Sequence, residues 1–459
     1  MLTIIDVLER AHRGPVCRVR DWDSKIIPQA VMAKLRKYNL LKTCDARRPI
    51  STDDALLDTF FRAGYELAHE QGMLCQDTER VIEVSESELR EAIDKAPSQI
   101  VLGRGKDQVT LRTRRPEDPT RPLYHSPLAI AVSEDLWERL LEGIARNPLI
   151  DILEAPSLIT VYGRKLLGGT PLETLAGALE VQKRDRVLRK VGRAGMPTVG
   201  IQSSTTYHGQ LGAYNVGGTH TDVALVLSPF ELKTGYSALH KVVQAINAKG
   251  TIRSGTPSMI GGYAGPPEGA ALTNIASTLL QYPVHQCHYA AGTLLDLRYN
   301  GNSGREGLWA FSTSIQAVSR NTNTVISKIS ETVCGPGTEL LLYELAAGLT
   351  MIGVSGASST TGPRSAGGRV ANHLTPLEAG FAASVFRASS RLTREQGNEI
   401  IGKLLPKYED AIFNPPNGSS FQDLYDVESL EPKPEWKAME RKVTGELSEL
   451  GIDLGREGI

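Results

Sequence analysis

The sequence has few cysteines and no long uncharged apolar run. No apolar stretch reaches the roughly 20 residues that a membrane-spanning helix needs, and charged side chains interrupt the first thirty residues where a signal peptide has its apolar core. The five cysteines among 459 residues are odd in number and scattered, which fits reduced thiols better than a disulfide framework. We therefore expect a cytoplasmic protein that contacts no membrane.

A charge excess of either sign is also missing. Lys and Arg total 51 against 52 Asp and Glu, so no strong field favours nucleic acid or an anionic surface as a partner. The phosphate-binding pattern G-x-x-x-x-G-K-[ST] is absent, and Gly103–Lys106 lies in a predicted hairpin rather than between a strand and a helix. Nucleotide binding therefore has little support.

Metal-binding patterns are weak. His285, Cys287 and His288 lie close in sequence, with Cys334 as a distant fourth candidate. Their spacing matches no common zinc pattern, and a strand sends adjacent side chains to opposite faces. We expect no metal site here.

The most distinctive segment that is present runs from Gly192 to Gly218. It carries seven glycines in 27 residues, many uncharged polar side chains, and a single charge at Arg193. Frequent glycines permit sharp turns and close approach of the backbone to a ligand, and the polar side chains between them can line a cavity. An ordinary surface loop has the same composition, so the surroundings must decide.

Residues 1–127 are predicted to form a helical and hairpin accessory region. A long helix begins after the capping residues 51–54 and reaches about Gln71, and Ser85 with Glu88 forms a capping box. Further helices are expected over Leu2–His12 and Pro28–Leu40, and a hairpin over 100–111.

Residues 128–410 alternate between short β-rich runs and helical segments, and 411–459 read as a C-terminal helical extension. Thr170 to Glu173 predicts one helix start with a capping box. Glycine-rich loops recur after many strands, so we favour an α/β fold of the closed (β/α)8 barrel (TIM barrel) type over an open doubly wound sheet. The active site is then expected where those loops meet. The β-rich runs are Ile150–Leu153, Met196–Ile201, Val223–Leu227 and Thr324–Ile329.

The pair His220 and Asp222 is a catalytic candidate. The i, i+2 spacing places both side chains on one face of an extended segment. A carboxylate beside a histidine sets the tautomer of the ring or binds a cation, although a pair that only satisfies buried hydrogen bonds is the more common case.

A set of short motifs resembles the monomethylamine:corrinoid methyltransferases of methanogens, in the same order over nearly the whole chain. The motifs are Asp21-Trp22-Asp23 with Ile27-Pro28, the hairpin VLGRGKDQV, Gly192-Arg193, Gly195-Met196, Gly200, Gly261-Gly262-Tyr263-Ala264-Gly265, Arg305-Glu306, Gly335-Pro336 with Thr338-Glu339, and Phe421-Gln422 with Tyr425-Asp426-Val427.

The resemblance implies a barrel enzyme that passes a methyl group from a methylated amine to the cobalt of a cobamide. A separate corrinoid-binding protein carries that cobamide, and the family's enzymes form homo-oligomers, with hexamers implied. Gly261, Gly262 and Tyr263 are the positions at which the resemblance suggests contact with the corrin ring.

The departures from the family are equally informative. The position of the family's pyrrolysine falls on Val199, which has no electrophile. Two family glutamates fall near Val226 and Gly255, and a glutamine and a tyrosine fall near Ile329 and Glu331. The resemblance therefore implies the scaffold without pyrrolysine chemistry, and a substrate other than monomethylamine.

A bulkier, quaternary amine fits such an enlarged pocket, because its nitrogen is already activated as a leaving group. Its cation needs carboxylates or aromatic faces. Asp222 and Glu331 are the expected charges, and Tyr207 and Tyr263 the expected aromatic surfaces.

Two alternatives stay open. The chain is an inactive paralogue that acts as a binding or scaffolding subunit, or an unrelated barrel enzyme that binds a phosphorylated substrate through the loop Gly353–Gly368. The retained polar residues argue against the first alternative, and the order of the motifs argues against the second.

Overall fold

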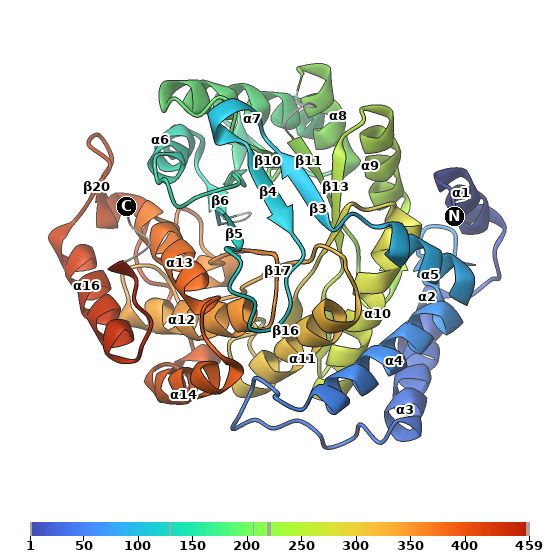
Figure 1. Cartoon of the computed structure of the whole chain (residues 1–459). Coiled ribbons are helices and arrows are strands. Elements are labelled where there is room, and N and C mark those ends of the chain that lie inside the picture. Colours follow the sequence, from blue (N-terminus) through green and yellow to red (C-terminus); the bar gives the residue numbers. More distant parts are fainter. Residues whose placement is uncertain (1, 128–129, 205, 218–221, 456–459) are drawn as a thin grey trace.

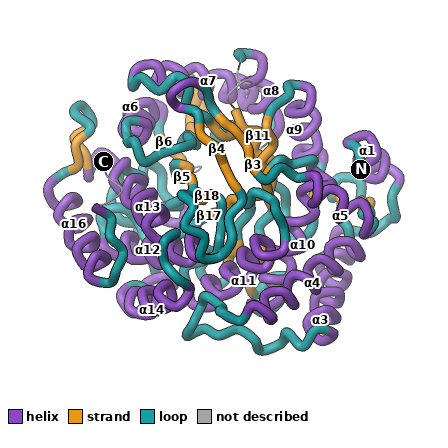
Figure 2. The backbone as a smooth tube through the Cα atoms, in the orientation of Figure 1, coloured by secondary structure: helices purple, strands orange, loops and turns teal. Residues whose placement is uncertain are grey.

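The computed structural model of the chain describes residues 2–127, 130–204, 206–217 and 222–455, and only the backbone of Asp222. Helices lie on the outside of the molecule, and most strands lie in its centre (Figure 1, Figure 2). Parallel strands alternate with helices through the middle of the chain, so the molecule is α/β, as the sequence predicts.

The N-terminal part consists of helices, a small mixed sheet and a hairpin. Its helices are α1 (Ile4–Arg13), α2 (Val19–Asp21), α3 (Ile27–Lys37), α4 (Asp54–Gln71) and α5 (Glu86–Lys95), and its strands are β1 (Met73–Cys75), β2 (Arg80–Ile82), β3 (Gln99–Leu102) and β4 (Val109–Arg112). The predicted helix starts are confirmed: Asp53 caps α4, and Ser85 and Glu88 form the predicted capping box of α5. The predicted hairpin is confirmed as β3–β4.

The central part carries most of the strands. Its helices are α6 (Glu134–Ala145), α7 (Pro171–Lys190), α8 (Tyr207–Asn215), α9 (Tyr236–Asn247), α10 (Pro267–His285), α11 (Arg305–Asn321), α12 (Glu339–Val354) and α13 (Pro376–Ser389). Its strands are β5 (Leu123–His125), β6 (Ala131–Val132), β7 (Ser157–Leu158), β8 (Thr160–Val161), β9 (Arg164–Lys165), β10 (Thr198–Val199), β11 (Asp222–Leu227), β12 (Lys233–Thr234), β13 (Thr251–Gly255), β14 (Ser258–Ile260), β15 (Tyr289–Ala291), β16 (Leu294–Asp296), β17 (Ser327–Ile329) and β18 (Ser359–Thr361).

The C-terminal part continues with helices and one small hairpin. Its helices are α14 (Arg394–Leu404), α15 (Phe421–Leu424) and α16 (Pro434–Glu449), and its strands are β19 (Tyr425–Asp426) and β20 (Glu431–Pro432). The division of the chain at residues 127 and 410 stays a prediction.

Two parallel ladders form the centre of the molecule. One has the order β10-β11-β13-β15, and the other has the order β17-β18-β5. Single parallel bridges add Ile152 beside His125, Leu153 beside Thr198, and Ile326 beside Ala290. The predicted strand Ile150–Leu153 therefore takes part only through single bridges.

Buried hydrophobic side chains of the described residues form two separate clusters. The large cluster lies between the strands and the surrounding helices. The small one, called here the inner core, contains Ile100, Leu102 and Leu111 of the hairpin together with Leu123, Ile152, Val199, Val223, Leu225, Tyr289 and Val325 from the central strands and the residues beside them. The alternation of side chains along a strand explains this division, because Val223 and Leu225 belong to the inner core while Ala224 and Val226 belong to the large cluster.

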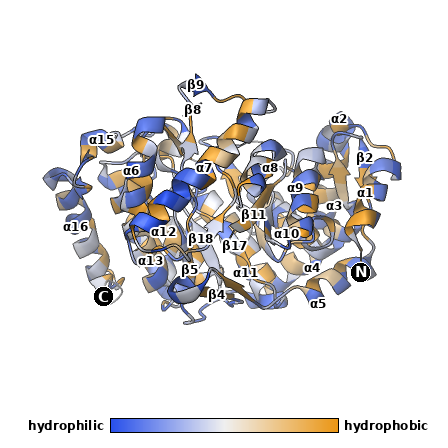
Figure 3. Ribbon diagram, turned by 90° about the horizontal axis from the view of Figure 1, so that it is seen from above, coloured by the Kyte–Doolittle hydropathy of each residue, from blue (hydrophilic) through white to orange (hydrophobic). Residues whose placement is uncertain are grey.

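The hairpin β3–β4 covers one end of the central strands. It lies in front of them in Figure 1, and the side view of Figure 3 places β4 and the β8–β9 hairpin at opposite ends of the molecule. The apolar side chains of β3 and β4 enter the inner core, so the hairpin closes that end of the strand assembly.

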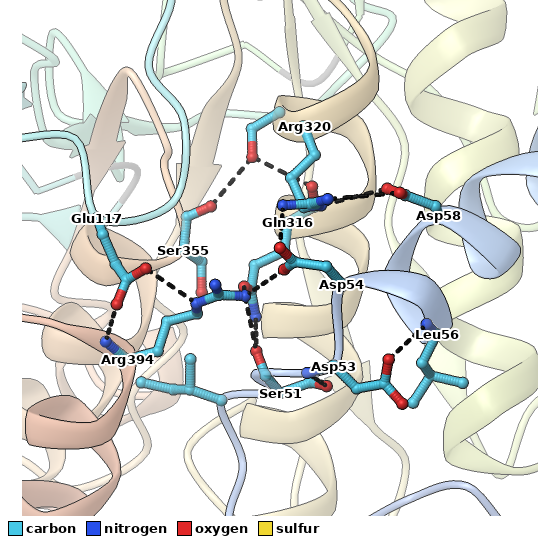
Figure 4. Close-up of polar contacts among 12 residues, drawn as sticks. Ser51, Asp53, Asp54, Leu56, Asp58, Glu117, Gln316, Arg320, Ser355 and Arg394 are labelled. Carbon is cyan, nitrogen blue, oxygen red and sulfur yellow. Dashed lines mark hydrogen bonds and ion pairs between the residues drawn. The ribbon is translucent and has the colours of Figure 1, made fainter.

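Ion pairs join the N-terminal part to two helices far along the chain. Asp54 at the start of α4 lies 2.9 Å from Arg320 of α11 and 2.7 Å from Arg394 of α14 (Figure 4). Arg320 also contacts Asp58, and Arg394 contacts Glu117, each at 3.2 Å. Asp54 therefore links three separate parts of the chain through one carboxylate.

We expect Leu111→Ala to destabilise the protein by about 2–5 kcal/mol, because Leu111 is fully buried in the inner core and its truncation leaves a cavity. Val101→Ala in the facing strand of the hairpin is the control, since Val101 is 51% exposed. The urea midpoint measures both variants. Equal midpoints for the two variants would show that the hairpin does not contribute to the core.

Candidate active site

Three of the predicted pocket residues lie at the carboxyl ends of central strands. Val199 ends β10, Gly255 ends β13 and Ile329 ends β17. Val199 is buried in the inner core, and Ile329 is buried opposite Thr361 of β18. The register separates two of them, because Val199 pairs with Val223 near the amino end of β11, whereas Gly255 pairs with Leu227 at its carboxyl end.

Val226 is placed differently from the prediction. It is fully buried in the large cluster between strands and helices, so it does not face the inner core. Its neighbour Leu227 pairs with Gly255 at the carboxyl end of β11 and is 46% exposed. Because successive side chains of a strand point to opposite faces, a shift of one residue exchanges the two faces. This placement does not support Val226 as a pocket residue.

Of the predicted pair His220 and Asp222, the structure describes the backbone of Asp222. His220 lies outside the described residues. Asp222 is the first residue of β11 and pairs with Thr198, so its backbone lies at the amino end of that strand. The opposite, carboxyl end of the same strand carries Leu227 beside Gly255.

The two predicted tyrosines are already engaged by other side chains. Tyr207 stacks on the rings of His208 and His240, with centroids 4.1 and 4.3 Å away. Two stacked rings cannot share one face, so both faces of Tyr207 are covered. Tyr263 is 39% exposed, and the Nζ atom of Lys233 lies 5.5 Å from its ring centroid. Only Tyr263 therefore keeps a ring face free for a ligand cation.

Glu331 lies two residues beyond the carboxyl end of β17 and is 6% exposed. Its Oε2 atom is 3.3 Å from the Nη1 atom of Arg364. Burial raises the pKa of Glu331, and the positive charge of Arg364 opposes that rise. A carboxyl group in this position combines low solvation with an adjacent cation, which is typical of a functional site.

A buried polar cluster that the sequence patterns did not identify lies among the central strands. Its centre is the Oε1 atom of Glu154, which accepts a short ion pair from Arg253 of β13 and lies 3.0 Å from the Nδ1 atom of His125. The other ring nitrogen of His125 is 3.1 Å from the hydroxyl of Ser359, and Gln202 donates to the second oxygen of Glu154 at 3.4 Å.

The charges in this cluster are balanced. Burial and the nearby charge of Arg253 lower the pKa of His125, so the imidazole is neutral at pH 7. Burial by itself raises the pKa of Glu154, but the charge of Arg253 and the hydrogen bond with His125 outweigh this effect, so the pKa of this carboxyl is lowered. Glu154 and Arg253 therefore form a buried ion pair of zero net charge. These residues come from separate segments of the chain, and no short motif joins them in sequence.

Two glutamates of α7 hold the glycine-rich segment. Glu180 accepts the backbone N–H groups of Gln202 and Ser203 at 3.0 and 2.8 Å. Because Gln202 also contacts Glu154, this anchor fixes the loop against the polar cluster.

Glu173 fixes the next part of the same segment. It accepts hydrogen bonds from the N–H groups of Gly169 and Thr206 and from the hydroxyls of Ser204 and Thr206. Thr170 makes no side-chain cap, so the predicted capping box is wrong and Glu173 reaches across to the loop instead. Burial alone raises a carboxyl pKa, but these bonds lower the pKa of Glu173 to about 2.

The segment Gly261–Gly265 forms a tight turn after β14. Gly261 and Gly265 have φ angles of 79° and 77°, and the N–H of Gly261 donates to the carbonyl of Gly265 at 2.8 Å. Glycine is favoured at both positions because their backbone is left-handed. A Cβ atom at Gly261 would lie 3.6 Å from that of Leu297, which is 59% exposed, so apolar surface borders the turn.

The histidines of the weak metal pattern make other contacts. His285 lies 2.8 Å from Thr234 and 2.7 Å from Ser254, and the Nδ1 atom of His288 accepts from the N–H of Ile252. Across the described part of the chain, no three His, Cys, Asp or Glu side chains gather where they can share a metal ion. Within the same residues, every helix is too short or too polar to cross a membrane.

Comparison with known proteins gives a family match over almost the full length. The family model described as "Monomethylamine methyltransferase MtmB" matches residues 2–452. Among curated proteins, monomethylamine methyltransferase MtmB3 of Methanosarcina barkeri (strain Fusaro / DSM 804) is 29% identical over 97% of both chains. MtmB2 of Methanosarcina barkeri is 28% identical over the same shares.

Solved structures agree with the sequence matches. The crystal structure of the Methanosarcina barkeri monomethylamine methyltransferase (MtmB) superposes with a TM-score of 0.94 at 27% identity and covers 98% of both chains. The crystal structure of the hydroxylamine MtmB complex gives the same values.

We expect Glu173→Gln to reduce stability at neutral pH and to matter less in acid. The folded-state pKa of Glu173 is about 2, below the ~4.3 of an unfolded glutamate, so its stabilisation is present above pH ~4.3 and is lost as the pH falls toward 2. Denaturant midpoints of wild type and variant at pH 7, 5, 4 and 3 measure the difference in stability. Glu449→Gln is the control, because Glu449 is exposed. A difference that stays constant down to pH 3 contradicts this assignment.

Proposed function

Because the chain belongs to the monomethylamine methyltransferase MtmB family, we propose that it transfers a methyl group from a methylated amine to the cobalt of a corrinoid carried by a partner protein, without pyrrolysine. The observation that carries this proposal is the valine at position 199, buried in the inner core at the end of β10. Valine forms no adduct with an amine, so the substrate must be activated in another way.

The central strands support a closed (β/α)8 barrel as the scaffold. The ladders and single bridges follow one another as a cycle: β5, the segment at Ile152 and Leu153, β10, β11, β13, β15, β17, β18, and again β5. All these pairings are parallel. We infer that the inner core is the barrel interior, that the hairpin β3–β4 closes its amino end, and that the active site lies at the carboxyl ends.

A methyl group leaves nitrogen only when the nitrogen carries a positive charge, because the neutral amine is then the leaving group. The chain must therefore hold a cationic nitrogen, align its methyl group and exclude water. Glu331 beyond β17 supplies a buried carboxyl for the cation, and Tyr263 supplies a partly free ring face. A quaternary amine fits these requirements because it is always charged and has no N–H.

The rim formed by Gly261, Gly262 and Tyr263 fits the approach of a broad flat group. A Cβ atom at Gly265 would meet no other atom within 4 Å, so the turn is open at this position, and exposed Leu297 adds apolar surface. A reduced corrinoid supplies the cobalt nucleophile that accepts the methyl group. The residues of this chain position the amine and leave the rim open to the partner protein.

Assembly and location belong to the same proposal. As in the family resemblance, we propose a homo-oligomer, a hexamer, that works in the cytoplasm with a corrinoid-binding protein. An inactive scaffolding paralogue is the alternative, and the assay below separates the two.

Purified protein mixed with a reduced corrinoid protein and a panel of methylated amines is expected to produce methyl-cobalt, seen in the visible spectrum. Quaternary amines should react and monomethylamine should not, because a primary ammonium group can lose its proton and with it the charge that activates the methyl group, and Val199 cannot form an adduct that would restore this activation. A pyrrolysine-containing family enzyme serves as the positive control. If no amine changes the spectrum while that control works, the inactive paralogue is the correct reading.

Glu331→Gln is expected to lower kcat/KM for a cationic substrate at least tenfold, equivalent to about 1.4 kcal/mol of transition-state stabilisation. The amide keeps the shape of the side chain and removes the charge that faces the ammonium group. Glu435→Gln at the exposed start of α16 is the control. Wild-type kinetics in Glu331→Gln would show that this carboxyl does not contact the cation.

A further inference from the structure

The barrel interior contains buried polar atoms that have no partner among the described residues. They are the Nε and Nη2 atoms of Arg253, the hydroxyl of Tyr289 and the hydroxyl of Ser327. All three residues are at most 1% exposed. Buried polar groups in folded proteins are almost always hydrogen-bonded. Several unpaired groups in one place therefore indicate a binding site for a polar ligand.

The strand register places these groups on one side of the sheet. Arg253 of β13 is the cross-strand partner of Tyr289 of β15, and Tyr289 belongs to the inner core. The bridge between Ala290 and Ile326 sets Ser327 opposite Ala291, diagonally next to Tyr289 on the same face. Burial raises the pKa of Tyr289, and the positive charge of Arg253 opposes that rise.

The free edge of Arg253 has a specific shape. Its Nη1 atom is used by Glu154, whereas Nε and Nη2 form the parallel pair of donors along the other edge of the guanidinium plane. Two parallel N–H groups match the two oxygens of a carboxylate. The hydroxyls of Tyr289 and Ser327 are further donors to the same kind of acceptor.

Small residues lie between these donors and the carboxyl end of the strands. Gly255 and Ala291 each follow by two positions on the same face, above Arg253 and Tyr289 respectively. The resemblance places a family glutamate near Gly255, so this chain has no side chain where a longer one is expected. The backbone of Ala291 lies close beside Gly255, since a Cβ atom there would be 2.5 Å from the carbonyl carbon of Ala291.

Charge balance selects the kind of molecule. Arg253 is already neutralised by Glu154, and His125 beside them is neutral. A carboxylate that enters alone adds an uncompensated buried charge, which is costly. A ligand with a carboxylate and its own ammonium group adds no net charge.

We propose that Arg253, Tyr289 and Ser327 bind the carboxylate of the substrate, so that the methyl donor is a zwitterionic trimethylammonium carboxylate rather than a simple methylated amine. This assignment rests on the proposed methyl transfer for the role of the ammonium group, while the carboxylate site stands on the orphaned donors themselves.

Binding to the purified protein tests the carboxylate site without any corrinoid protein. Calorimetric titration compares trimethylammonium carboxylates with one to three methylene groups between the charges, their methyl esters, and tetramethylammonium. At least one acid is expected to bind tenfold or more tightly than its own ester. The proposal is overturned if no acid binds more tightly than its ester.

Tyr289→Phe and Ser327→Ala separate ligand binding from a structural role. Each removes a hydroxyl that has no partner in the fold, so each should leave the stability of the free protein unchanged or raise it. Affinity for the acid should fall about tenfold, and affinity for the ester should stay the same. Unchanged acid affinity in both variants would mean that ordered water alone occupies these groups, and would refute the proposal.

Tyr282→Phe is the matched control. The hydroxyl of Tyr282 is buried but donates to the carbonyl of Val325 at 3.1 Å and accepts from the N–H of Ala290. This variant should lose stability and keep its affinity for the acid. If acid binding depends on Tyr289 but the protein forms no methyl-cobalt, the proposed carboxylate site is correct and the proposed methyl transfer is wrong.

Discussion

The buried ion pair between Arg253 and Glu154 is the constraint on which the interior of the molecule depends. Two charges removed from water are costly unless each is paired and hydrogen-bonded. Glu154 meets this requirement through Arg253, His125 and Gln202, which come from separate parts of the strand assembly. The ion pair therefore fixes how these segments stand relative to one another.

The same pair uses only the Nη1 atom of Arg253 and leaves its Nε and Nη2 donors without a partner among the described residues. A purely structural interior of this size would be filled with branched apolar side chains, as the hairpin end of the inner core is. The inner core is packed with apolar side chains near the hairpin, whereas unpartnered hydrogen-bond donors lie near Tyr289. We assign ligand binding to this second region. Stability and ligand binding thus share one residue, Arg253, whose two edges serve the two purposes.

Much of the architecture followed from local sequence signals. The caps at Asp53 and Ser85 and the hairpin at β3–β4 depend on neighbouring residues, and all are found in the structure. The site was harder to predict because successive residues of a strand point to opposite faces, and Val226, predicted to line the pocket, faces the surrounding helices instead. Tyr207 could not be judged either, since its stacking partner His240 comes from another helix.

The sequence by itself determined the family, the α/β class and the valine at position 199, because motifs, hydrophobic patterns and residue identity are written along the chain. Only the tertiary structure decided which polar residues meet. His125, Glu154, Arg253 and Ser359 are far apart in sequence and carry no common motif, yet the assembly of the central strands brings their side chains into contact. An unpaired donor is costly only where water is excluded. Because Arg253 is buried, its unpaired Nε and Nη2 atoms are the strongest indication of what the protein binds.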